Sequence, residues 1–362
     1  MQVDWSAVRK AVIACVSGVA VCFLGVPASL AAQTHGERAL AAAAQKEGEL
    51  DYVDNLMAPK SRAAMQEAFV KRYGLTGFKF APHLLKSAEL IGRVEAEVSS
   101  GHVTTDWALV NDYAFWQSLK KAHALLKYCA PEYAAFHLLS TVGIPNGACY
   151  FQASHGVTFT PMWNPKFVHA NLTSWNQLID SKYKGKVIMS DARKAPVYLD
   201  TFIGLRQVLP LSWFKALAKL HPFLLVRSTE IRDKVMTGEF PIAVWGYAPR
   251  AYQVRKEVRL RVSYPKEGVV LEGAFGGILA KAPHPAAAKL WTDFFYSKEG
   301  QTILVKYEGV ISGRSDLRVS PAVRKYIPAL KSIKVIPVKW AKITRAERKK
   351  ARDEFRSIFG NP

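Results

Sequence analysis

Short apolar runs alternate along this chain with longer stretches whose apolar residues recur at helical spacing. Residues 50–53, 107–110 and 187–190 have the length and the apolar content of buried strands. Each of these runs is followed by a polar turn and then by a stretch such as 59–73, in which apolar residues gather on one side of a helix. Repeated units of strand, turn and helix predict an α/β protein with doubly wound sheets covered by helices.

Two further apolar segments, residues 157–163 and 269–279, are interpreted as strands that cross from one compact body to another. The second lies in YPKEGVVLEGAFGGILAKAPHP at 264–285, where glycines permit bends and close backbone approach. A chain of 362 residues also suits two domains better than one ordinary core. The predicted first lobe comprises residues 32–156 and 275–362, and the predicted second lobe comprises residues 157–274.

Several stretches share an order of residue types with a known family. They are QKEGELDYVDNL at 45–56, EAFVKRY at 67–73, TSWNQL leading to SKYKGKV at 173–187, and YPKEG through AAAKLWTDFFYSKEGQ at 264–301. This order, spread over about residues 36–312, resembles the extracellular solute-binding proteins of ABC importers. The resembling branch of that family includes ferric-ion, polyamine and phosphosugar binders.

The resemblance implies a class II periplasmic binding protein fold, in which two doubly wound lobes joined by two crossing strands close like a Venus flytrap. It also implies a periplasmic monomer that captures a small polar solute and delivers it to an inner-membrane ABC permease. No cofactor is implied. Solute-binding proteins of this kind are not enzymes.

Candidate ligand-binding residues stand where the predicted strands end. In doubly wound sheets the loops after the strands converge, and each following helix start offers unpaired N–H groups. Two such sheets would face each other across a cleft. The candidates are Asp54, Asn55, Asn111, Trp163, Ser190, Arg193, Lys194, Trp245, Tyr247, Glu272, Ala274 and Phe275.

Several of these candidates have a simpler alternative role. Asp54 and Asn55 are residues that commonly form turns or helix caps. The two tryptophans could be core residues, and Arg193 with Lys194 could form a solvated loop. These alternatives stay open on the sequence alone.

The ligand class follows from the charges at these positions. Arg193 and Lys194 next to a helix start favour an anion, so a carboxylate- or phosphate-bearing solute is predicted. Ferric-ion members of the family use adjacent tyrosines, whereas Tyr247 is followed here by Ala248. Binding of a ferric ion or an iron chelate is therefore the alternative.

No catalytic motif accompanies the predicted fold. The chain lacks a Gly-x-Ser-x-Gly elbow, a His-Glu-x-x-His pair, a phosphate-cradling GxxxxGK loop and a GxGxxG loop, and its nine histidines show no ligand spacing. We therefore predict neither catalytic residues nor a metal site. An enzyme on the same fold is the less favoured alternative, which turnover would reveal.

The formal charge of +21 suggests a nucleic-acid or membrane partner at first sight. About half of it lies in one segment, because residues 313–362 hold 14 Lys and Arg against 4 Asp and Glu. No nucleic-acid-binding motif accompanies this charge, so nucleic acid is not a predicted partner. The tail is instead predicted to pack onto the first lobe and to end in a helix at 345–359, with a disordered arm as the alternative.

The first 31 residues have the pattern of a cleaved signal peptide. Arg9 and Lys10 precede an apolar run at 11–26, and Ser29 and Ala31 are small residues at the positions that a signal peptidase recognises. The mature chain is predicted to begin near residue 32 in the periplasm. The alternatives are a retained membrane anchor, or a lipoprotein attached through Cys15.

The mature chain would keep only Cys129 and Cys149. An even pair in an oxidising compartment is compatible with a disulfide. Two buried free thiols are the alternative.

Overall fold

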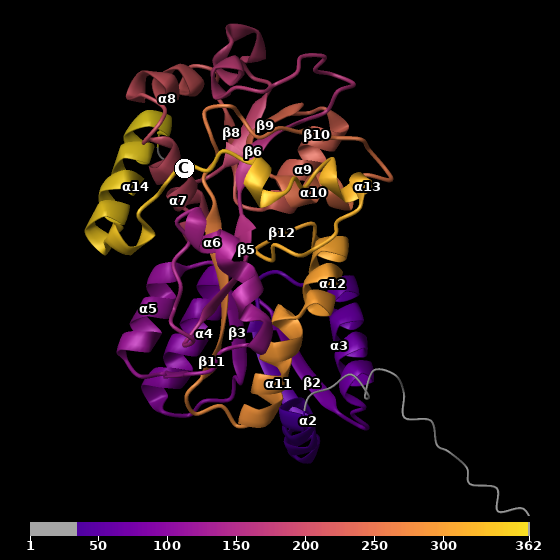
Figure 1. The fold of residues 1–362 in the computed structure, drawn as a ribbon. Helices are drawn as coiled ribbons and strands as arrows, with labels where there is room; N and C mark the ends of the chain where they lie inside the picture. The colour runs from indigo at the N-terminus through magenta and orange to yellow at the C-terminus, as the bar shows by residue number, and fades with distance from the viewer. Residues whose placement is uncertain (1–34, 361–362) are drawn as a thin grey trace, which may run out of the picture.

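Two β-sheets, one above the other in Figure 1, form the frame of the protein. The computed structural model describes residues 35–360. The predicted signal peptide lies outside these residues. Among them, no helix combines the length and the apolar character needed to cross a membrane.

The first sheet is mixed, and its central strands are fully buried. Its strands follow the order β12 (Ile311–Ser312), β5 (Gln152–Val157), β11 (Glu272–Leu279), β3 (Trp107–Val110), β1 (Glu49–Asp54) and β2 (Lys79–Leu84), with β4 (Leu125–Leu126) beside β11. Strands β1, β2 and β3 are parallel, whereas β11 runs antiparallel to both β3 and β5. The loops after the three parallel strands therefore lie at one edge of this sheet.

We define the first lobe as this sheet with the helices packed around it, of which residues 35–360 contain seven α-helices. They are α2 (His35–Glu47), α3 (Pro59–Tyr73), α4 (Ser87–Ser100), α5 (Tyr113–Lys121), α6 (His137–Thr141), α11 (Pro285–Tyr296) and α12 (Lys298–Glu308). Local sequence sets their ends. Helix α3, for example, begins at a proline, and Gly74 ends it in the left-handed conformation with φ 66°.

The second sheet follows the order β10 (Arg261–Val262), β6 (Phe159–Trp163), β9 (Ile242–Tyr247), β7 (Val187–Ser190) and β8 (Phe223–Leu225). Its helices are α7 (Pro196–Leu205), α8 (Leu211–Ala218), α9 (Ser228–Thr237) and α10 (Ala248–Gln253). Together they form the second lobe. Strands β7, β8 and β9 are parallel, so their carboxyl ends also share one edge.

The chain passes between the sheets where the apolar pattern predicts crossing segments. The first passage lies between β5 and β6, which are separated by Thr158 alone, and the return leads into β11. Glycines let β11 lie close to the aromatic core. A Cβ atom on Gly276 would lie 2.5 Å from the Trp107 ring, and one on Gly277 would lie 2.7 Å from the Trp116 ring.

Aromatic side chains dominate the core of the first lobe. Tyr52 stacks on Trp291 with ring centroids 5.0 Å apart, and Phe69 meets the same tryptophan edge-on at 5.3 Å. All three side chains are fully buried. These contacts fasten α3 and α11 to β1, and such aromatic pairs add stability beyond the area that they bury.

The last helix of the basic tail does not pack where the sequence pattern predicts. This helix, α14 (Arg345–Phe359), has the predicted bounds, but it packs against α7 and α8 of the second lobe, as Figure 1 also shows. The fully buried Phe355 lies 5.4 Å from Phe202 and 6.3 Å from Trp245, and Arg206 pairs with Glu354. For α14 the prediction of packing on the first lobe is wrong, because this apolar surface and these charges lie on the second lobe.

Cys129 and Cys149 are bonded as a disulfide, with their Cα atoms 4.7 Å apart. The disulfide alternative is therefore confirmed over the free thiols. Replacing both residues by serine should lower the free energy of unfolding by about 3 kcal/mol, because the bridge closes a loop of 20 residues. Chemical denaturation measures this change. Reductant should reproduce the loss in the native protein and leave the double variant unaffected, and equal stability of both proteins would contradict the prediction.

Candidate functional site

A cavity of about 130 Å³ lies between the two lobes. We call it the interlobe cavity. Its first-lobe wall consists of Asn55, Leu56, Ser87, Asn111, His155, Val157, Ala274 and Glu308, and its second-lobe wall consists of Phe159, Val197, Ser228, Tyr247 and Arg250. Strand ends and helix starts of both lobes thus meet at one place, as expected for the carboxyl edges of parallel strands.

The first-lobe wall carries a network of neutral polar side chains. The Nδ2 of Asn55, just after β1, donates to the Oγ of Ser87 at 2.9 Å and to the Oδ1 of Asn111 at 2.5 Å. Ser87 begins α4, after β2, and Asn111 follows β3. The network therefore joins the loops that follow three adjacent parallel strands, which fixes its geometry.

The second-lobe wall carries a positive charge. Arg250 lies on α10, one turn after the end of β9, and donates from Nε to the Oγ of Ser228 at 3.1 Å and from Nη1 to the Oε1 of Gln253 at 2.7 Å. Its guanidinium lies 5.7 Å from the ring centroid of Tyr247. Within residues 35–360 it forms no ion pair, so no protein carboxylate neutralises it directly.

The one acidic side chain among the described residues that line the cavity, Glu308, already accepts hydrogen bonds from protein groups. Glu308 accepts from the backbone N–H of Ala58 at 2.7 Å, from the Oγ of Ser61, and from the Nε2 of Gln253 at 3.1 Å. The last of these bonds joins α12 of the first lobe to α10 of the second. Glu308 therefore serves as an interlobe contact and leaves Arg250 as the cation available to a ligand.

The other titratable groups in the wall are neutral near pH 7. Burial lowers the pKa of His155 to about 3, and its Nδ1 lies 2.8 Å from the Oγ of Ser154. Burial also raises the pKa of Tyr247 above its ordinary value, so the phenol keeps its proton. A solute in the cavity would therefore meet one guanidinium, the hydrogen-bonded carboxyl group of Glu308 and a set of neutral hydrogen-bonding groups.

Helix starts add to this positive character. Ser87 is the first residue of α4 and Ser228 is the first residue of α9, and both line the cavity from opposite lobes. The first N–H groups of a helix have no intrahelical acceptor, and the helix dipole favours negative charge there. Among the described residues, no group of three or more His, Cys, Asp and Glu side chains could hold a metal ion.

The structure brings four of the predicted site residues together at the interlobe cavity: Asn55, Asn111, Tyr247 and Ala274. Glu272 and Phe275, from the same strand as Ala274, line a much smaller neighbouring space of about 10 Å³ that Asn111 also borders. The return crossing strand therefore contributes to both spaces.

Four predicted residues lie elsewhere in the protein interior. Asp54 accepts from the backbone N–H groups of Leu56 at 2.8 Å and Met57 at 2.5 Å, which is the turn-forming alternative, and burial raises its pKa to about 6. Trp163, Ser190 and Trp245 are at most 2% exposed and do not line the cavity.

The predicted cationic pair is also used elsewhere. Arg193 donates from Nε to Oδ1 and from Nη2 to Oδ2 of Asp191, both at 2.8 Å. Its guanidinium lies 5.7 Å from the Phe355 ring and bonds to the carbonyl of Gly360. Lys194 is exposed. Arg193 therefore anchors the tail, and it does not line the interlobe cavity.

Sequence reasoning missed Ser87, Ser228, Arg250 and Glu308. Both serines begin helices that follow strands, β2 and β8, and positions after strand ends are the pattern used for the other candidates. Arg250 follows Tyr247 by three residues, so on a helix both side chains share one face. Only the three-dimensional contact with α3 identifies Glu308.

A second polar cluster joins the lobes beside the cavity. Arg348 of α14 donates from Nη2 to the Oδ2 of Asp200 on α7 at 2.8 Å, and its Nη1 lies 4.0 Å from the Oδ2 of Asp112 in the first lobe. Glu272 lies close enough to interact electrostatically with all three. One guanidinium thus faces three buried carboxyl groups, and burial raises the pKa of Asp200 to about 7.

Comparison with known sequences adds an independent finding. A sequence profile described as bacterial extracellular solute-binding protein matches residues 130–344, which is more than half of the chain. No curated protein sequence matches the chain.

Comparison with solved structures identifies the fold. The substrate-binding protein of an ABC transporter from Agrobacterium tumefaciens is similar, with a TM-score of 0.69 and 15% identity over 86% of this chain and 94% of that chain. AfuA from Actinobacillus pleuropneumoniae, solved with fructose-6-phosphate bound, has a TM-score of 0.68 and 18% identity over 86% of this chain and 98% of that chain. Iron-bound HitA from Pseudomonas aeruginosa has a TM-score of 0.66 and 18% identity over 86% of this chain and 99% of that chain. The expected class II periplasmic binding protein fold is confirmed.

Proposed function

The chain belongs to the family of bacterial extracellular solute-binding proteins, and we propose that it captures a small anionic solute in the interlobe cavity and delivers it to the permease of an ABC importer. The similar protein from Agrobacterium tumefaciens is the substrate-binding component of such a transporter. The structural neighbour AfuA, bound to a sugar phosphate, supports an anion as the cargo. No catalytic step and no cofactor are part of the proposal.

The assignment of an anionic solute rests on one observation, which is that Arg250 has no acidic partner within residues 35–360. Its guanidinium lines the cavity without an ion pair among the described residues, whereas Glu308 already accepts three hydrogen bonds from protein donors. A carboxylate or phosphate would form charge-assisted hydrogen bonds with Arg250, which are the strong class of hydrogen bond in proteins. The helix starts at Ser87 and Ser228 would supply further N–H donors from both sides.

Binding to both walls at once provides the mechanism. A solute that contacts the Asn55 network in the first lobe and Arg250 in the second stabilises the closed arrangement of the lobes. It does so only by the difference between its affinities for the closed and open states. We propose that the moving units are residues 32–156 with 275–344, and residues 157–274 together with α14, which is packed on the second lobe.

An iron complex is the second candidate cargo. Iron-bound HitA shares the fold, and Tyr247 offers a phenol at the cavity. Adjacent tyrosines are absent, since Ala248 follows Tyr247. An anionic chelate of iron would nevertheless present carboxylates to Arg250, so ferric citrate belongs in the test.

A thermal-shift screen tests the proposal. Sugar phosphates, small dicarboxylates, citrate and ferric citrate are added to the wild-type protein and to Arg250→Gln. A solute at a hundred times its dissociation constant adds about 2.7 kcal/mol to the stability of the folded protein, which raises the midpoint by several degrees. We expect at least one anion to do so in the wild type and much less in the variant. No shift with any of these anions, or an equal shift in Arg250→Gln, would contradict the anion assignment.

Export to the periplasm is part of the same proposal. The signal-peptide pattern of residues 1–31 predicts that the mature chain begins near residue 32. Intact-mass analysis of the protein from a periplasmic extract should show the loss of those residues. A full-length mass, or recovery only from the membrane fraction, would contradict the prediction. A mass increased by lipid at Cys15 would also contradict it.

A further inference from the structure

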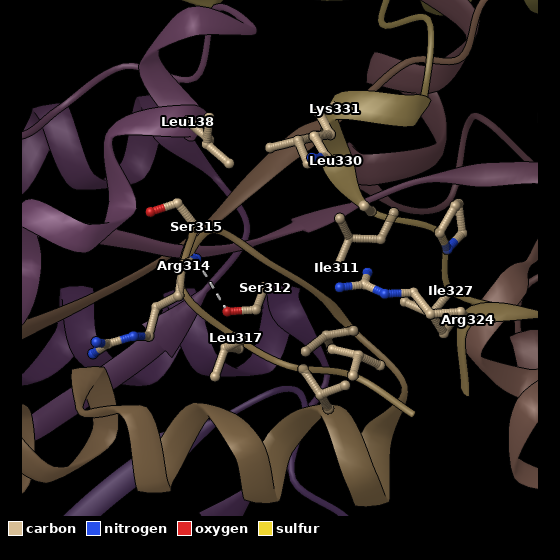
Figure 2. A pocket seen from close by; sticks show the side chains of 15 residues that line it. Leu138, Ile311, Ser312, Arg314, Ser315, Leu317, Arg324, Ile327, Leu330 and Lys331 are labelled. Atoms are coloured by element: carbon tan, nitrogen blue, oxygen red, sulfur yellow. Dashed lines mark hydrogen bonds between the residues drawn. The ribbon is translucent and has the colours of Figure 1, made fainter. Parts of the chain in front are cut away.

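A cavity of about 350 Å³ lies where the tail passes over α12 and β12 (Figure 2). We call it the tail cavity. Its apolar wall includes Leu138 of α6, Val305 of α12, Ile311 of β12, and Ile327 and Leu330 of the tail. It shares no lining residue with the interlobe cavity. It is also the larger of the two, with a volume near the lower end of the range for small-molecule sites.

The charged side chains around the tail cavity are all cationic. Arg314, Arg324 and Lys331 line it, and no Asp or Glu of the part of the chain that the structure describes does so. Arg314 is already engaged, because its guanidinium donates to Asp316 at 2.8 and 2.9 Å and to Glu132 at 2.7 Å. Arg324 and Lys331 form no ion pair and no side-chain hydrogen bond within residues 35–360.

Arg324 is the cation placed to act on a ligand. Figure 2 shows its side chain extending from the tail toward Ile311 in the middle of the space, whereas the Arg314 guanidinium points away. Partial burial without a counter-charge lowers the pKa of Arg324 below its usual range. An unpaired cation held against apolar walls is costly, and a bound anion would remove that cost.

We propose that the tail cavity is a second binding site, for a small monocarboxylate with an apolar body. The carboxylate would accept two parallel hydrogen bonds from the guanidinium of Arg324, with Lys331 adding positive charge at the rim. The carbon chain would lie against Leu138, Ile311 and Leu330.

The tail cavity lies between the first lobe and the tail. Leu138 and Ile311 belong to the first lobe, whereas Arg324 and Leu330 belong to the tail that later docks on the second lobe through α14. A ligand in the tail cavity would contact both and hold the tail against the first lobe. The site is independent of the solute proposed for the interlobe cavity.

Calorimetric titration with octanoate tests the proposal, with octan-1-ol as the uncharged probe of similar shape and benzoate as a shorter carboxylate. We expect saturable binding of at least one carboxylate and binding at least tenfold weaker in Arg324→Gln, since one charge-assisted pair is lost. The matched control is Lys325→Gln, which removes a charge from the exposed neighbouring residue that does not line the cavity. Octan-1-ol should bind at least tenfold more weakly than octanoate.

Each other outcome overturns the proposal. No saturable binding of either carboxylate would do so, as would equal affinity in Arg324→Gln and the wild type. Loss of binding in Arg250→Gln instead would place the probe in the interlobe cavity. Should Arg324→Gln fail to fold, Ala329→Leu decides, because it enlarges a lining side chain without changing charge. Unchanged octanoate affinity in that variant would also contradict the site.

Discussion

Replacing Arg348 by methionine should lower the free energy of unfolding by about 3 to 5 kcal/mol at pH 8. The change keeps an apolar stem but removes the guanidinium that faces the carboxyl groups of Asp112, Asp200 and Glu272. The Arg348 and Asp200 side chains are only 16% and 4% exposed, so solvent screens the pair weakly. Breaking a buried pair from one side is strongly destabilising, because the partner charge stays buried alone.

The loss should depend on pH in a defined direction. Burial raises the pKa of Asp200 from its ordinary 3.8 to about 7, and burial also raises the pKa of Glu272. A carboxyl group with a raised pKa in the folded state stabilises that state at low pH, and this contribution is lost as the pH rises from about 4 through about 7. Protonated carboxyls need no guanidinium partner. The destabilisation by Arg348→Met should therefore be smaller at pH 5 than at pH 8.

Urea unfolding at pH 5 and pH 8 measures both effects. The matched control is Lys349→Met, which removes the neighbouring positive charge from the same helix. Lys349 is exposed and, among the described residues, pairs only with Asp353, so its loss should change stability by no more than about 0.5 kcal/mol. Equal effects of the two substitutions, or a larger loss at pH 5, would show that the carboxyl cluster does not act as described.

Replacing Arg250 by glutamine should weaken binding of the anionic solute about ten- to a hundredfold. Removing one hydrogen bond to a charged group costs about 1.5 to 3 kcal/mol, and each 1.4 kcal/mol is a factor of ten in affinity. The folded protein should tolerate the change, because within residues 35–360 the Arg250 side chain bonds only to the neutral side chains of Ser228 and Gln253. Calorimetry with the strongest anion of the thermal-shift screen measures the affinity.

Arg255→Gln is the control for this experiment. Arg255 follows α10 and stacks on the ring of Tyr252 at 3.8 Å, but it does not line the interlobe cavity. Its substitution removes the same net charge from the same lobe. Equal loss of affinity in both variants would indicate a long-range charge effect rather than a contact in the cavity. Retained affinity in Arg250→Gln would remove the central residue of the proposed site.

The fold could be predicted to a large extent because its strands are local apolar runs. Residues 107–110 and 187–190 are the full extents of β3 and β7, and the helix at 345–359 has the bounds of α14. The length and composition of such segments suffice to identify them. The packing partner of α14 could not be predicted, since it depends on Phe202 and Asp200, far away in sequence.

The candidate site could be predicted only where it follows directly from strand ends. Asn55, Asn111 and Tyr247 end or follow strands and line the cavity. The expected cation was placed at Arg193, at a strand end of the same kind, but Asp191 and the tail engage that side chain. Arg250 takes its place because a helical turn carries it from the end of β9 to the cavity. Which cation remains unpaired is a tertiary property.

Hydrogen exchange with and without the bound anion tests most directly whether one solute is held by both lobes. The amides at the starts of α4 and α9 belong to different lobes, and the first amides of a helix lack intrahelical acceptors and exchange readily. We predict that the anion slows exchange at 87–89 and at 228–230 together, and that Arg250→Gln abolishes both effects at the same solute concentration. Protection confined to one lobe, or found only at the tail cavity, would contradict capture between the lobes.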